Sequence, residues 1–424
     1  MHTDRGKWDR GDLVRRLARV LDVAKKALTR LAPAGYTDSV EPSLSVRPEK
    51  VISETAVLLL AASAARQEPE IETRTKTLAE LLMVHARSDR MRLGVCLEPA
   101  LSLDYAQAHA CLSRLGYPDP AFDKLLEQSQ LSQARSGRER PPHRVLEQQW
   151  IAGLLGISPA GLRKHNGSAA AASVLGNPLD LLSGGREDVY ALTHALMFVA
   201  GGDLPPRPLP RRRSAILSEA EAVLAWCLDE SDYDLGGEVL LAWPLTGSPW
   251  SPAAAFGFRV LARVEDVVGF LPSAGTRVER LNKLQGDERT NYLMASAYHT
   301  AYVMGLLCAA SLRPGCAPPV AIPTRKAQPG SAKAILTRLG AGAAHWREEL
   351  DRLTEPERDS LTGLILTAAL RRRVRDRDFD GVRELLSAGY EWGLADSPAA
   401  SQAAEMLERL ASFGEMARPA ADAP

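Results

Sequence analysis

Apolar residues recur at intervals of three and four positions along nearly the whole chain, which is the period of an α-helix. The opening segment shows the pattern, with apolar side chains at Leu13, Leu17, Val20, Leu21, Ala24 and Leu28. Pro33 and Gly35 then interrupt it. The best strand candidate, residues 238–241, lies in a stretch whose spacing is equally helical. We therefore predict an all-α fold with sheet content close to zero.

Very apolar segments alternate with more polar ones. Residues 54–65 lack a polar face, so we predict a buried helix there with Ser53 as its N-cap. Residues 71–88 carry polar side chains on one face only. Prolines and glycines separate such segments at short intervals, which predicts antiparallel helical hairpins. Repeated hairpins pack as an open solenoid or close into an α/α toroid, and the small residues of the apolar segments favour closure.

A run of small residues at 166–178 is typical of a linker. It predicts two packed halves, an N-terminal helical half over residues 1–165 and a C-terminal helical half over residues 179–424.

The charge balance and the hydropathy pattern disfavour several classes of protein. Lys and Arg together number 52, as do Asp and Glu, so no net field attracts nucleic acid or anionic lipid. The longest apolar stretches, residues 56–65 and 302–312, are shorter than the roughly 20 residues that a membrane span needs. Residues 4–10 are charged and do not resemble a secretory signal. We expect a cytoplasmic protein without nucleic-acid or membrane partners.

The sequence predicts neither a cofactor nor a metal. Its five cysteines lack C-x-x-C spacing, and it contains no phosphate-binding loop, dinucleotide, zincin or α/β-hydrolase motif. Asp234, His299 and Cys308 have the residue types of a mixed zinc site. Cys308 follows His299 by nine positions, however, and so lies near the opposite side of the same helix. This spacing disfavours zinc.

One short pattern recurs in the chain. The sequence Y-A-x-x-H-A occupies residues 105–110 and again residues 190–195, and His299 lies in a similar apolar setting. His109, His194 and His299 are thus separated by 85 and 105 residues. Such spacing fits two helical hairpins per structural step.

His194 and His299 are candidate catalytic residues. One interpretation is that each imidazole is a hydrogen-bonded core residue that bridges two helices. The other is a shared central pocket, in which the histidines act as general acid or base. His109, Tyr190 and Tyr298 would then contribute to binding, since each lies on an apolar segment of the same kind.

An acidic cluster precedes an apolar segment at Asp232, Asp234 and Glu238. Its place at a helix start explains part of it, because carboxylates are favoured near a helix N-terminus. Asp234 and Glu238 are also four positions apart, so both lie on one face and can bind a cation or share a proton. We take Asp232 and Asp234 as candidate catalytic groups and Glu238 as a candidate ligand-binding group.

Residues 137–144 read G-R-E-R-P-P-H-R. This block forms either a polar turn between helices or a site in which Arg138 and Arg144 bind a carboxylate or phosphate.

Several segments resemble a family of uncharacterised all-helical proteins from actinobacteria, known only as a domain of unknown function. They are R-E-D-V-Y-A-L-T-H-A-L at 186–196, D-Y-D-L-G-G-E-V-L-L-A-W at 232–243, Y-H-T-A-Y-V-M-G-L-L-C-A-A at 298–310 and the block at 137–144. The resemblance covers most of residues 50–312. It implies helical architecture and a frequent setting among specialised-metabolism genes.

Two functions fit these observations. The first is an accessory protein that presents a helical surface to a protein or peptide of a biosynthetic pathway. The second is an enzyme of cyclase or lyase type that binds a small molecule in an apolar central pocket. The second requires His194, His299 and the acidic pair to converge. The absence of a recognised catalytic motif favours the first.

Overall fold

The computed structural model describes residues 9–36, 44–157, 168–340 and 345–416. In these ranges the chain is all-helical, and its single β-bridge joins Tyr36 to Val46. The all-α prediction is therefore confirmed, and residues 238–240 are helical with Leu241 as the C-cap of α11. The charged residues 4–8 and the start of the predicted linker, residues 166–167, lie outside the described residues.

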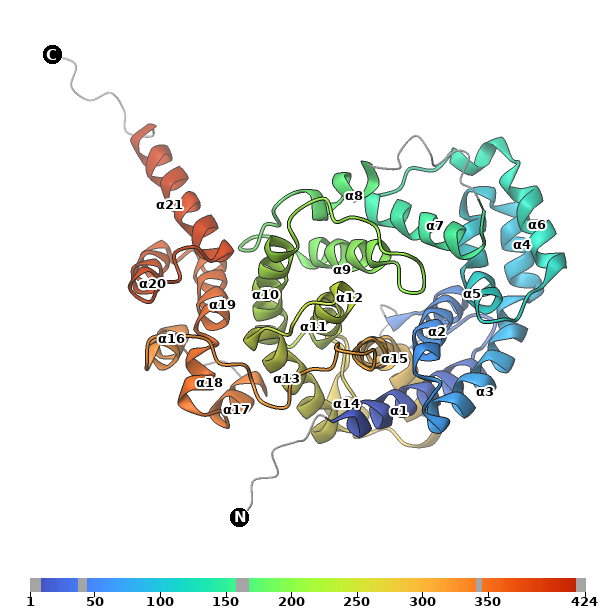
Figure 1. The fold of residues 1–424 in the computed structure, drawn as a ribbon, viewed down its shortest axis with the longest axis horizontal. Coiled ribbons are helices and arrows are strands. Elements are labelled where there is room, and N and C mark those ends of the chain that lie inside the picture. Colours follow the sequence, from blue (N-terminus) through green and yellow to red (C-terminus); the bar gives the residue numbers. More distant parts are fainter. Residues whose placement is uncertain (1–8, 37–43, 158–167, 341–344, 417–424) are drawn as a thin grey trace.

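Six helices form a closed circuit in which each packs on the next and the last returns to the first (Figure 1). In order around the circuit they are α2 (Pro48–Ala62), α5 (Ser102–Arg114), α7 (Pro142–Leu154), α9 (Arg186–Ala200), α11 (Tyr233–Leu240) and α15 (Gly286–Ser311). We call these the ring helices. They come from both of the halves that the sequence predicts, and α7 packs directly on α9 across the predicted linker.

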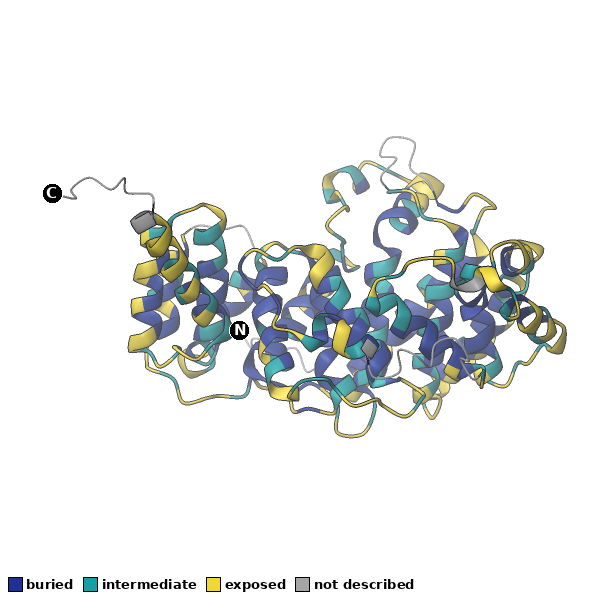
Figure 2. Cartoon of the chain, turned by 90° about the horizontal axis from the view of Figure 1, so that it is seen from above, coloured by how far each residue is buried: buried dark blue, intermediate teal, exposed yellow. Residues whose placement is uncertain are grey.

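Further helices pack against the outside of the ring. They are α1 (Arg10–Thr29), α3 (Pro69–Ala86), α4 (Asp89–Leu97), α6 (Pro120–Gln130), α8 (Ser168–Ala172), α10 (Arg213–Asp229), α13 (Pro252–Val268) and α14 (Val278–Leu281). The short helix α12 (Ala242–Thr246) instead follows α11 inside the ring and packs on α9 and α15 (Figure 1). α1 packs on α15, α3 and α2, so the first helix joins both ends of the circuit. Figure 2 shows the buried residues concentrated on the inner faces of these helices.

Arg16 links α1 to α13 through a buried ion cluster. Its guanidinium contacts Asp12 at 2.8 Å, Asp266 at 2.9 Å and Glu265, while its side chain is only 3% exposed. Burial alone would lower the pKa of Arg16, but the three carboxylates outweigh it and raise that pKa. The guanidinium of Arg16 thus provides a charged partner for Glu265, which is buried among apolar residues of α13.

The last helices form a separate layer beside the ring (Figure 1). They are α16 (Ser331–Leu339), α17 (His345–Asp351), α18 (Glu355–Asp359), α19 (Thr362–Arg375), α20 (Phe379–Glu391) and α21 (Pro398–Met416). α19 packs on α10, and α17 packs on α13. The layer also contacts the segment before α9, because Arg371 of α19 donates to the backbone carbonyls of Leu181 and Gly184.

Two boundaries differ from the sequence expectation. α2 begins at Pro48 with Arg47 as its N-cap, so Ser53 is an interior helical residue and not a cap. α15 is long and apolar enough to cross a membrane by length and composition alone, whereas the sequence analysis considered only its most apolar part. Its apolar window is 78% buried, as expected of a helix that packs on α1, α2 and α11 at the centre of the fold.

Candidate functional site

A cavity of about 890 Å³ lies at the centre of the ring. Every ring helix contributes at least one ionisable side chain to its wall. In ring order these include Glu54, Asp104, Glu147, His194, Glu238 and His299, and the wall also holds the charged residues Arg47, Glu49, Lys50, Arg90 and Arg144. We call this space the central cavity. Its volume is in the range of natural small-molecule sites, about 300–1,000 Å³.

His299 occupies the middle of the polar wall. Its Nδ1 lies 3.1 Å from Oε2 of Glu54, and its Nε2 lies 3.4 Å from Oε1 of Glu238. Asp234 approaches Nε2 at 3.7 Å. Tyr298 orients Glu54, because its hydroxyl donates to Oε2 at 2.7 Å. An imidazole on α15 is thus held between carboxylates from α2 and α11.

The carboxylates determine the charge of this imidazole. Burial alone would lower the pKa of His299, but the negative charges of Glu54 and Asp234 and the contact with Glu238 raise it well above its usual range. Burial would likewise raise the pKa of Glu54, yet the positive charge of His299 lowers that pKa to about 2. Burial would raise the pKa of Glu238 too, but the neighbouring imidazoles of His194 and His299 lower it. The charged forms of His299, Glu54 and Glu238 therefore stabilise one another.

Glu238 also connects His299 to His194. Its Oε2 accepts a 2.5 Å hydrogen bond from the Thr193 hydroxyl and lies 3.6 Å from Nδ1 of His194. Nδ1 of His194 contacts the backbone carbonyl of Tyr190 at 3.0 Å. Because a carbonyl can only accept, Nδ1 carries a proton there, which assigns the lone pair of a neutral imidazole to Nε2. The two candidate histidines are thus brought together through one carboxylate.

The remaining acidic candidates, Asp232 and Asp234, lie next to this centre and are held by Arg186. Arg186 contacts Asp232 and Asp234, each at 3.2 Å. Asp232 also caps α11 by accepting from the backbone N–H of Leu235, and burial raises the pKa of Asp232. Thr300 donates to Asp234 at 3.0 Å. As predicted, Asp234 and Glu238 lie on one face of α11, and both approach His299.

Only one of the two candidate arginines, Arg144, reaches the central cavity. Arg144 lines the central cavity, contacts Glu147 at 2.7 Å and donates to the Tyr190 hydroxyl at 3.2 Å. Arg138 is exposed in the turn before α7 and does not line the cavity. The block at residues 137–144 is therefore partly a polar turn and partly a contributor to the site. The rings of Tyr190 and His194 contact each other, with their centroids 3.7 Å apart and their planes 31° from parallel.

His109 does not join the other two histidines. Its Nε2 contacts Asp123 of α6 at 2.7 Å, and its ring stacks on Phe122. Burial lowers the pKa of His109 despite that carboxylate. His109 thus faces the outer helices, whereas Tyr105, from the same Y-A-x-x-H-A pattern, lines the cavity. His109 therefore does not line the central cavity as predicted, because its imidazole contacts Asp123 and Phe122 of α6 instead.

In the described part of the chain, no three His, Cys, Asp or Glu side chains are arranged to hold a metal ion. Cys308 is buried away from the cavity, where burial raises the pKa of its thiol.

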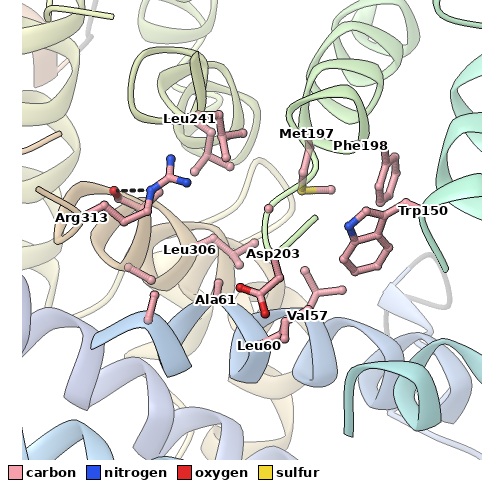
Figure 3. Close-up of a pocket in the computed structure, with 15 residues that line it drawn as sticks. Val57, Leu60, Ala61, Trp150, Met197, Phe198, Asp203, Leu241, Leu306 and Arg313 are labelled. Carbon is pink, nitrogen blue, oxygen red and sulfur yellow. Dashed lines mark hydrogen bonds between the residues drawn. The ribbon is translucent and has the colours of Figure 1, made fainter. Parts of the chain in front are cut away.

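A second, apolar space continues the ring axis beyond the central cavity (Figure 3). We call it the apolar chamber; its volume is about 100 Å³. Five residues line both spaces and form what we call the dividing layer: Val57, Met197, Phe198, Leu241 and Leu306. On α2, α9 and α15, lower-numbered residues line the cavity and higher-numbered ones the chamber, so these helices run in the same direction along the axis.

The sequence analysis missed several charged lining residues, among them Glu54, Asp104 and Glu147. Glu54 could have been identified from the sequence, because it is a lone carboxylate before the apolar C-terminal part of its helix. Glu147 left a weaker one, since it is buried between Arg144 and Trp150 in a stretch of polar residues that reads as exposed.

No curated protein and no solved structure matches the chain. A family model, described as a domain of unknown function (DUF6895), matches residues 17–309. This range contains all six ring helices except the last two residues of α15, and with them the whole polar wall of the central cavity. By this match over most of its length, the chain belongs to the DUF6895 family.

Proposed function

We propose that this protein is an enzyme, of cyclase or lyase type, that moves protons within a small molecule bound in the central cavity. The observation that carries the proposal is the continuous contact from Glu54 through His299 and Glu238 to His194. Buried acid and base groups that converge on one cavity are typical of catalytic sites. We further propose that the reaction belongs to specialised metabolism, which the resemblance to actinobacterial proteins supports, and that it takes place in the cytoplasm.

The architecture we propose is an α/α toroid, with the ring helices inside and the outer helices around them. The closed circuit of contacts supports it, and so does the shared direction of α2, α9 and α15. In such a toroid, side chains from every inner helix face one axis; the contribution of at least one ionisable side chain by each ring helix to the cavity wall supports this arrangement.

The two histidines have different roles in this proposal. Nε2 of His194 accepts a proton from the substrate, because Nδ1 of the same ring donates to the Tyr190 carbonyl. His299, which is positively charged between its carboxylates, donates a proton to the product-forming atom. Glu238 lies between both rings and stabilises whichever one is protonated. Asp234 holds His299 from behind and is a positioning residue.

A second candidate is an accessory protein that binds a protein or peptide of the same pathway. The layer α16–α21 favours it, since these helices lie beyond the family match and present their own surface. The ring side chains point inward, however, and an accessory role gives no reason for a buried imidazolium between two carboxylates. We therefore place the accessory role second.

The test replaces the chromosomal gene with His194→Gln or His299→Gln in the source organism and compares metabolites by mass spectrometry. We expect a lost product or an accumulated precursor, while circular dichroism of the purified variants shows native helix content. His345→Gln is the matched control, because His345 is exposed on α17, far from the cavity. Normal product from both folded variants would exclude the enzyme. If deletion of the gene still removed the product, the accessory role would take its place.

A further inference from the structure

One side-chain amide, that of Gln107 on α5, lines the central cavity. Gln107 is only 8% exposed, yet its amide forms no hydrogen bond with any described residue. An amide of this kind has two N–H donors and a carbonyl acceptor. Because buried polar groups are as a rule hydrogen-bonded, this amide indicates a bound group that supplies the missing partners.

Two other buried glutamines show the usual arrangement. Gln148 of α7 is also 8% exposed, and its amide nitrogen donates to Asp104 at 2.9 Å. Gln149, the next residue, accepts from Arg207. Neither Gln148 nor Gln149 lines the cavity. Gln107 thus differs from them in that its amide has the cavity, and not a protein group, beside it.

The hydroxyl of Tyr190 is a second polar group of the wall with hydrogen-bonding capacity left over. It accepts from Arg144 at 3.2 Å but donates to none of the described residues. Burial raises the pKa of Tyr190, so the hydroxyl keeps its proton at neutral pH. That proton is available to an acceptor atom in the cavity.

The charged residues of the wall, in contrast, pair mainly with one another. The pairs are Arg90 with Glu49, Lys50 with Glu54, Arg144 with Glu147, and His299 with both Glu54 and Glu238. Asp104 contacts Arg140 at 3.7 Å, and Arg47 is exposed at the start of α2. The interior of the cavity therefore selects neither a cation nor an anion by net charge, and its unpaired groups are neutral.

We propose that Gln107 binds an amide group of the substrate, a primary carboxamide or a lactam, through two parallel hydrogen bonds. The substrate C=O accepts from the Gln107 side chain, and the substrate N–H donates to it, as glutamine pairs with other groups that present a donor beside an acceptor. This inference rests on the proposed function and names a group that its substrate carries. In the order of the circuit α5 stands opposite α11, so the rest of the molecule extends toward His194 and His299 on the helices that flank α11.

The test is a calorimetric titration of the purified full-length protein with four compounds that share a cyclohexane ring. They are cyclohexanecarboxamide, its N,N-dimethyl derivative, cyclohexanecarboxylate and cyclohexylmethylammonium. The carboxamide should bind about fivefold or more tightly than each of the others, because each of them loses one hydrogen bond to Gln107. No saturable binding of the carboxamide, or equal affinity for the carboxamide and its dimethyl derivative, would overturn the inference.

Two glutamine variants separate binding from folding. Gln107→Leu should remove the preference for the carboxamide over its dimethyl derivative and leave the thermal unfolding midpoint unchanged or slightly raised, because it breaks no hydrogen bond within the protein. Gln148→Leu is the matched control. It should lower the midpoint, because Asp104 loses a donor, and should retain the preference. A full preference in folded Gln107→Leu would refute the assignment.

The outcomes for this inference and for the proposed function are distinguishable. Loss of product in His299→Gln, together with a full carboxamide preference in Gln107→Leu, would mean that the enzyme stands and that the amide site is wrong. Normal product in folded His194→Gln and His299→Gln, together with a lost preference in Gln107→Leu, would retain the amide site and exclude the enzyme.

Discussion

Gly237 of α11 faces Val303 of α15 so closely that a Cβ atom on the glycine would lie 2.6 Å from Cγ1 of the valine. This contact sets the distance between the two helices that carry Glu238 and His299. We predict that Gly237→Ala forces the helices apart and destabilises the fold by about 1–3 kcal/mol, as overpacked core substitutions do. Urea unfolding measures the loss, and weakened ligand binding should accompany it.

Gly236 provides the control on the same helix. A Cβ atom there would lie 3.5 Å from Cβ of Cys227, an ordinary contact. Alanine is favoured over glycine in a helix by about 1 kcal/mol, so Gly236→Ala should be neutral or slightly stabilising. Equal stability of the two variants would show that α11 and α15 can separate freely, which would contradict the close approach at Gly237.

The ion cluster at His299 predicts a pH-dependent contribution to stability. The pKa of His299 is raised in the folded state, so its stabilising effect is complete below about pH 6.5, the unfolded value, and is lost as the pH rises through the folded pKa. His299→Gln should cost about 3 kcal/mol at pH 6, because it leaves two buried carboxylates without their partner. The difference in unfolding free energy between wild type and variant should shrink from pH 6 to pH 8.

At acidic pH, the contribution of Glu54 to stability depends on pH in the opposite direction. The pKa of Glu54 is lowered to about 2 in the folded state, so its contribution is complete above about pH 4.5 and disappears as the pH falls toward 2. His345→Gln should keep the wild-type profile on both limbs. A constant difference between wild type and His299→Gln across pH 6–8 would contradict the raised pKa.

Arg16 and Arg15 form a second matched pair. Both contact Asp12, but the Arg16 side chain is 3% exposed and also binds α13, whereas the Arg15 side chain is 60% exposed. We predict that Arg16→Met destabilises the protein by about 3–5 kcal/mol, since it leaves buried carboxylates unpaired. Arg15→Ala should change stability by less than about 1 kcal/mol. A similar effect of both substitutions in thermal unfolding would mean that the α1–α13 cluster is not tightly packed.

Much of the helical content could be predicted because apolar periodicity is a local property. The amphipathic pattern from Leu13 to Leu28 became α1, and the spacing of Asp234 and Glu238 correctly placed both carboxylates on one face. The start of α2 was harder to predict. Pro48 at its first turn is as compatible with a loop as with a helix start, so Ser53 was a plausible cap until packing chose the earlier position.

The site could be predicted only in part, because it depends on which way each helix is rotated. His109 and His194 lie in the same six-residue pattern, yet one contacts Asp123 of an outer helix and the other approaches Glu238 inside the ring. The sequence of α5 and α9 alone does not contain that rotation. Glu54, one of the acidic partners of His299, was missed for a related reason. It is 245 positions away in the sequence, and only the closed circuit of helices brings it near His299.

The packing of α2 on α15 has a consequence for how the chain folds during its synthesis. Thr55 and Tyr302 share a buried 2.9 Å hydrogen bond across 247 residues, so α2 leaves the ribosome long before its partner exists. At a translation rate of about 5–20 residues per second, roughly 12–50 s pass before α15 can cover the apolar face of α2 that packs on it. The nascent chain is therefore an expected client of chaperones that shield such surfaces, and the cavity is completed only after α15 is synthesised.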